Sequence, residues 1–153
     1  MIKRALLTAV LVSVTLAGSA SAAKELPACA VTEATQAKPP DDPNADPFGY
    51  GPWQINQDRT IWATWGMDRL KAGPKGNKVL WIRPAGTQLT VSGRRLDATA
   101  PPMKAILPCC YPTGFQASGL NFPTAGCWRV DALAGTNKLT FVTLVEAEAK
   151  RPE

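Results

Sequence analysis

Two stretches near the C-terminus decide the fold: Gly126–Leu133, GCWRVDAL, and Lys138–Val145, KLTFVTLV. Side chains on successive residues of a β-strand point to opposite faces, so every second residue shares a face. Gly135-Thr136-Asn137 between the stretches is typical turn chemistry, which predicts that the two form a hairpin.

Alternation sorts the side chains of this hairpin into two faces. The first face carries Trp128, Val130 and Ala132 with Leu139, Phe141 and Val145, and we expect it to face the core; the second carries Cys127, Arg129 and Asp131. Val142 and Leu144 also fall on the second face. Because apolar side chains there need cover, we predict that a loop or an N-terminal linker lies over that face.

The chain upstream has the same texture of short apolar runs separated by turn residues. Further strands are predicted at Thr60–Trp65, Val79–Arg83, Thr87–Arg94, Pro102–Leu107 and Gly119–Phe122. No window shows sustained helical periodicity, and a sheet must bury its apolar face against another layer. We therefore predict an all-β domain over residues 53–145, an immunoglobulin-like antiparallel β-sandwich of about seven strands.

The segments outside this domain indicate export. Residues 1–22 combine Lys3-Arg4, a short apolar run and small residues ending at Ala22, the pattern of a cleavable signal peptide. Residues 23–52, rich in Pro and Asp, are predicted to form an extended segment and linker, and residues 146–153 a flexible tail. Asp42, Asn44 and Asp46 resemble the start of a calcium loop, but Pro47 and Trp53 stand where such a loop needs Gly and Glu. We expect a periplasmic or extracellular protein with no transmembrane anchor in the mature chain.

Composition excludes several classes of function. The chain has no histidine, which removes His-dependent nucleophilic catalysis and the usual zinc sites. The net charge of +5 is spread along the chain without a concentrated basic stripe, so no nucleic-acid partner is expected. We predict an exported, non-catalytic binding or structural module without metal or cofactor, whose partner is an envelope protein or a glycan. The alternative is a small carboxylate-dependent hydrolase, although acids such as Asp58 and Asp68 are scattered.

Aromatic and basic residues supply the candidate binding surface. Trp62, Trp65 and Trp81 are candidates for stacking on a sugar or a peptide, and Trp62 and Trp65 cannot share one face of a regular strand. Arg94 and Arg95 are a candidate anion site, against which we weigh a structural corner in which Asp97 holds one arginine.

Four cysteines in an exported chain predict disulfides. The outward direction of Cys127 leaves two arrangements open: Cys29 from a covering segment pairs with Cys127, or Cys109 or Cys110 pairs with Cys127 and the other with Cys29. The first arrangement requires a bridge between adjacent cysteines, which geometry disfavours. If Cys109 and Cys110 were left to each other, a redox or copper role with Met67 or Met103 would be a further alternative.

Several motifs resemble a family of uncharacterised secreted bacterial proteins with an immunoglobulin-like domain, over residues 79–145. They are Ser92-Gly93-Arg94-Arg95-Leu96-Asp97, Ala100-Pro101-Pro102, Thr113-Gly114-Phe115-Gln116 and Gly126-Cys127-Trp128. The resemblance implies a fold, an exported location and a bridge from Cys29 to Cys127, and we adopt that pairing. Leu26-Pro27-Ala28-Cys29 ends like a lipoprotein box, but Lys24, Glu25 and the earlier cleavage site argue against lipid anchoring at Cys29.

Overall fold

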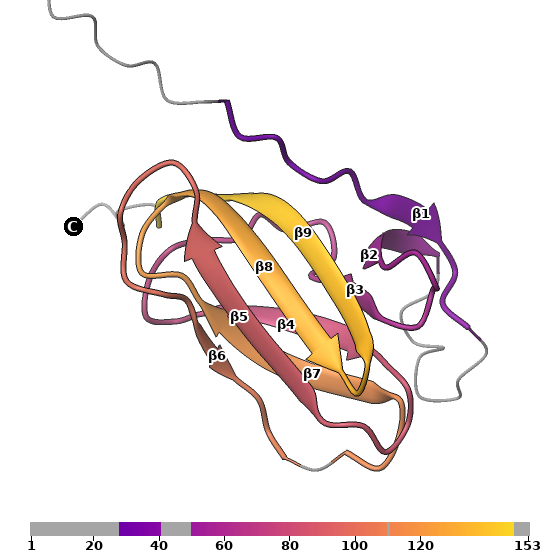
Figure 1. The fold of residues 1–153 in the computed structure, drawn as a ribbon. Coiled ribbons are helices and arrows are strands. Elements are labelled where there is room, and N and C mark those ends of the chain that lie inside the picture. The colour runs from indigo at the N-terminus through magenta and orange to yellow at the C-terminus, as the bar shows by residue number, and fades with distance from the viewer. Residues whose placement is uncertain (1–27, 41–49, 110, 149–153) are drawn as a thin grey trace, which may run out of the picture.

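The computed structural model describes residues 28–40, 50–109 and 111–148 (Figure 1). The predictions for the signal peptide, for Asp42–Asp46, for Cys110 and for the last five residues of the tail lie outside the described residues.

The described residues form nine antiparallel strands in two sheets. The larger sheet has six strands in the order β1-β2-β3-β4-β7-β6, and the smaller has three in the order β5-β8-β9. The strands are β1 (Thr35–Ala37), β2 (Gly51–Ile55), β3 (Trp62–Thr64), β4 (Asn77–Ile82), β5 (Leu89–Arg95), β6 (Lys104–Ile106), β7 (Phe115–Asn121), β8 (Gly126–Ala134) and β9 (Asn137–Val145).

The two-layered architecture confirms the all-β part of the predicted fold class, with nine strands among the described residues in place of the predicted seven or so. In Figure 1 the β5-β8-β9 sheet lies across the strands of the larger sheet, so that the two pack face to face. The division into six and three strands departs from the four and three of an immunoglobulin constant domain. The structure therefore establishes the sandwich-like class and not that topology. No helix among the described residues is long and apolar enough to cross a membrane.

Three strands, β1, β2 and β7, depart from the sequence-based expectation. β1 and the start of β2 lie in the segment predicted as linker, and they pair with Thr35 opposite Trp53 and Ala37 opposite Gly51. β1 is only three residues long and its first two are exposed, so it carries no apolar alternation. β7 starts at Phe115, four residues before the predicted strand, because Ser118 and Gly119 interrupt its apolar run.

The predicted core face of the C-terminal hairpin is confirmed. Trp128, Val130 and Ala132 are all fully buried, and Phe141 opposes Val130 in the register. Trp128 meets Phe122 edge-on with ring centroids 5.4 Å apart, and its indole N–H donates to the Thr124 carbonyl. Burial of these aromatic side chains between the sheets favours folding.

A second, smaller core lies on the outer face of the larger sheet. Trp62 pairs with Ile82, while their neighbours Ala63 and Trp81 pair on the inner face, so the two tryptophans point to opposite sides. Trp53 meets Trp62 edge-on at 5.9 Å, and Ala37 of β1 packs against the same cluster. The N-terminal strand thus helps to bury aromatic surface outside the main core.

Candidate functional site

The structure places two of the three candidate surface tryptophans in the interior. Trp62 is 2% exposed and Trp81 is fully buried, with its indole N–H donating to the Ser118 hydroxyl. This corrects the expectation that they form part of a binding surface: Trp62 is covered by the outer cluster and Trp81 by the opposite sheet. Trp65, just beyond the end of β3, is half-buried and stacks on Phe141 with centroids 5.5 Å apart.

The two candidate arginines, Arg94 and Arg95, are successive residues of β5, so their side chains point to opposite faces of the strand. Arg94 is exposed on the outer face of β5, whereas Arg95 turns back to Asp97, with Nε to Oδ1 at 2.6 Å. This ion pair lowers the pKa of Asp97. The arrangement is the structural corner that was the alternative to an anion site, and Gly126 accommodates it because a Cβ there would overlap the Arg95 guanidinium.

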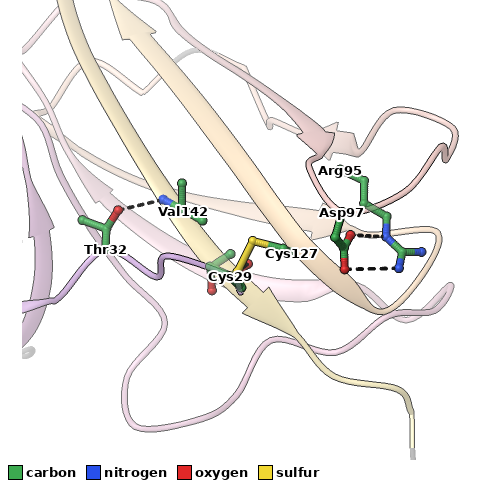
Figure 2. The surroundings of a disulfide bond; sticks show 7 residues. Cys29, Thr32, Arg95, Asp97, Cys127 and Val142 are labelled. Atoms are coloured by element: carbon green, nitrogen blue, oxygen red, sulfur yellow. Dashed lines mark hydrogen bonds and ion pairs between the residues drawn. A yellow bond between two sulfur atoms is a disulfide. The ribbon is translucent and has the colours of Figure 1, made fainter. Parts of the chain in front are cut away.

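The described N-terminal segment is attached to β8 and β9 (Figure 2). Cys29 forms a disulfide with Cys127 of β8, 98 residues away, which confirms the pairing that the family resemblance implies. Thr32 then forms two hydrogen bonds with the edge of β9: its N–H donates to the Val142 carbonyl, and its hydroxyl oxygen accepts from the Val142 N–H. Cys127 is consequently buried although it points away from the core.

The N-terminal segment covers the outward face of the β8–β9 hairpin only in part. Val142 is half-buried, but Leu144 remains 49% exposed. Cys109 also belongs to a disulfide. Of the methionines considered as copper ligands, Met103 packs in the core, and Met67 is 88% exposed beside another cleft.

A cleft of about 500 Å³ opens at the end of the sandwich where β4 ends and β5 and β7 begin. We call it the Arg83 cleft. Its apolar lining comes from Leu89 on β5 and from the loop between β6 and β7, which contributes Leu107, Pro108, Tyr111 and Pro112. Among the described residues that line it, Arg83 is the only charged one. Small-molecule sites are typically concave, mostly apolar and about 300–1,000 Å³ in volume.

Arg83 is 4% exposed, and the described residues offer it only neutral acceptors. Its Nε donates to Gln116 Oε1 at 2.9 Å, Nη1 to the Pro84 carbonyl and Nη2 to the Tyr111 carbonyl, both at 3.2 Å. Desolvation lowers the pKa of Arg83, since burial disfavours the charged form. The group nevertheless stays cationic, because an arginine titrates far above neutral pH.

Arg83 was not among the predicted site residues, although the sequence holds a signal for it. It is the last residue of the predicted strand Val79–Arg83, and alternation gives it the same face as Val79 and Trp81, both fully buried. A charged residue on a core-facing position is rare unless it is paired. That departure marks Arg83 as unusual without indicating the cleft, whose other residues come from distant loops.

A second cleft, of about 730 Å³, lies toward the opposite end of β4. It is lined by Trp65, Met67, Asp68 and Arg69, with Lys71, Lys78 and Glu146 among its other residues. Arg69 forms an ion pair with Glu146 at 2.6 Å, and both side chains are more than a third exposed. Charged side chains of both signs therefore line this cleft.

Comparisons with known proteins assign no family. No family model matches the chain, and no curated protein matches it. A solved structure described as a putative lipoprotein from Bacillus anthracis aligns with 63% of this chain and 78% of that chain, at 14% sequence identity and a TM-score of 0.44. The chain is therefore distantly similar in structure to that protein.

Proposed function

We propose that the protein is an exported, non-catalytic binding module of the bacterial cell envelope, and that the Arg83 cleft is its binding site. The observation that carries the proposal is a mostly apolar cleft of small-molecule size with one buried cation beside it. The described lining residues include no serine and no carboxylate. A site of this composition suits recognition of a ligand.

The disulfide supports export, because such bonds persist mainly in oxidising compartments. Together with the N-terminal signal pattern, that bond supports our proposal of a periplasmic or extracellular location. A sulfur engaged in a disulfide cannot also carry a thioether, so we expect Cys29 to be unlipidated wherever the bridge to Cys127 forms. Intact mass measurement of the exported protein checks this expectation.

The rival function, a carboxylate-dependent hydrolase, has one observation in its favour. Asp68 and Glu146 both line the second cleft, so two carboxylates border one cavity. Glu146, however, is already engaged in an ion pair with Arg69 at 2.6 Å.

The test is a fragment screen on the isotope-labelled mature protein, read by NMR. We expect fragments to shift the amide signals of Leu107, Tyr111 and Gln116, and we expect Gln88→Trp to weaken that binding by partly filling the cleft. Ser92→Trp is the matched control, because Ser92 is equally exposed nearby on β5 and does not line the cleft. Fragments that shift only the Met67 and Glu146 region, or a hydrolysis activity lost in Asp68→Asn, would refute the proposal.

A further inference from the structure

The charge at the Arg83 cleft is unbalanced among the described residues. Arg95 and Arg129 each hold a carboxylate, at 2.6 Å and 3.0 Å, although both are more exposed than Arg83. Arg83 is the most buried of the three and is bonded only to a side-chain amide and two carbonyls. Buried charges in proteins are usually paired, because neutral acceptors only partly replace the water that a charge loses.

The guanidinium also retains donor capacity. It carries five N–H groups, and its three bonds to Gln116, Pro84 and Tyr111 use one on each nitrogen. Each Nη nitrogen therefore has a second N–H beyond that bond. Two parallel N–H donors of a guanidinium match the two oxygens of a carboxylate, which is the geometry of strong, charge-assisted recognition.

We propose that the Arg83 cleft binds a carboxylate attached to an apolar body, with the carboxylate paired to Arg83. This inference rests on the proposed function and adds the chemical class of the ligand. The apolar body contacts Leu89, Leu107, Pro108 and Pro112, which line the cleft beside the cation. The backbone around the cation is held in place: the Arg83 N–H donates to the Gly114 carbonyl, and Gln116 also bonds the Pro108 carbonyl. The cation is thus positioned before a ligand arrives.

A carboxylate on an apolar body occurs both in free organic acids and at the C-terminus of a peptide. Two matched pairs of probes separate these sources. The first pair is 4-phenylbutyrate and 4-phenylbutanamide, and the second is acetyl-Ala-Ala-Phe with a free C-terminus and the same peptide amidated. Within each pair the shape is nearly the same and the charge differs.

The experiment is a titration of the wild-type mature protein with all four probes, followed by NMR shifts of the Arg83 Nε–H and of the cleft amides. We expect at least one acid to bind about tenfold or more tightly than its amide, with the largest shifts at Arg83 and Tyr111. The preferred pair then identifies a free acid or a peptide terminus as the ligand type. Equal binding of acid and amide within both pairs would overturn the inference and leave the proposed binding function standing. No binding by any probe at millimolar concentration would also overturn it, and the fragment screen then decides the proposed function separately.

A variant separates recognition from a purely structural role of Arg83. Arg83→Lys keeps the charge and removes the paired donors, so we expect the affinity for the acid to fall about fivefold or more while that for the amide is unchanged. Lys78→Gln is the control, because Lys78 is an exposed cation of β4, the strand that ends just before Arg83, and it lines the other cleft. A structural role alone would lower the binding of acid and amide equally. If Arg83→Lys fails to fold, the wild-type comparison of acid with amide still decides the inference.

Discussion

The β8–β9 hairpin and the N-terminal segment from Ala28 to Ala37 lie next to each other but are held by different kinds of interaction. The hairpin pairs over nine residues, from Gly126 opposite Val145 to Ala134 opposite Asn137. The N-terminal segment is held by a disulfide to β8, by hydrogen bonds to the edge of β9 and by three residues of pairing with β2. In the hairpin, neighbours along the sequence determine the structure, whereas in the segment nearly every contact is with a residue far away in the chain.

Because the two regions are held by different interactions, we expect substitutions in them to affect stability differently. A change in the core of the hairpin removes contacts on which both sheets depend. A change in the N-terminal segment uncovers the outward face of the hairpin or breaks the link to β8, and it should leave the two packed sheets intact. Four measurements test this comparison, in order of expected effect.

The largest effect is expected for Trp128→Ala on the core face of β8. It removes a fully buried ring that packs against Phe122 and donates to Thr124, so the free energy of unfolding should fall by about 4 kcal/mol. Chemical denaturation followed by circular dichroism measures the change. Leu133→Ala is the control, because Leu133 lies on the same strand and is 45% exposed. An equal loss in both variants would contradict the assignment of the core face.

Loss of the disulfide should have the next largest effect. Replacing Cys29 and Cys127 together by Ser removes a cross-link between residues 98 apart. Because the unfolded chain then has greater entropy, the free energy of unfolding should fall by about 3 kcal/mol. The β-sheet signal in circular dichroism should persist at room temperature. Peptide mapping of the unreduced wild type must first yield a fragment linking Cys29 to Cys127. A double variant without sheet structure would show that the N-terminal segment is as essential as the hairpin.

A smaller, pH-dependent effect is expected at Asp131 on the outward face of the hairpin. Its hydrogen bonds from Arg129, then from Thr140 and Lys138, outweigh desolvation and lower its pKa to about 2. Because the folded pKa lies below the value near 3.9 of an unfolded chain, this contribution is present above about pH 4 and is lost as the pH falls toward 2. With the side chain partly exposed, we expect about 1 kcal/mol.

Asp131→Asn is the test of that contribution. The variant should be less stable than the wild type at pH 6, and the difference should shrink as the pH falls from 4 to 2. A difference that is constant over this range would exclude the ion pair as its cause.

The smallest effect is expected for Thr32→Val in the N-terminal segment. The variant loses the hydroxyl that accepts from the Val142 N–H but keeps the backbone bond to the Val142 carbonyl. Because Thr32 is exposed and water can replace the lost acceptor, the free energy of unfolding should fall by only about 0.5 kcal/mol. Amide hydrogen exchange at Val142 is the sensitive measurement, and it should accelerate while exchange at Val130 stays unchanged. Unaltered protection of Val142 would show that the side-chain bond is dispensable for the attachment.

The sequence predicted most accurately the features that depend on neighbours along one strand. Trp128, Val130 and Phe141 follow a period of two, and their burial was assigned correctly. The same rule indicated that Trp62 and Trp65 do not share a strand face, yet it did not show that Trp62 is buried on the outer side of the sheet. That outcome depends on Trp53 and Ala37, which reach Trp62 from strands that the sequence pattern did not reveal.

By itself, therefore, the sequence determined the all-β class, the faces of the C-terminal hairpin and the expectation of disulfides, because each follows from local chemistry or residue type. Only the tertiary structure decided that β1 joins the larger sheet, that two of the three candidate surface tryptophans are buried, and that Arg83 borders an apolar cleft. The physical reason is that a strand edge, a covered aromatic ring and a cleft are each completed by residues distant in the chain. The pattern along a strand records which way a side chain points but not which segment it meets there.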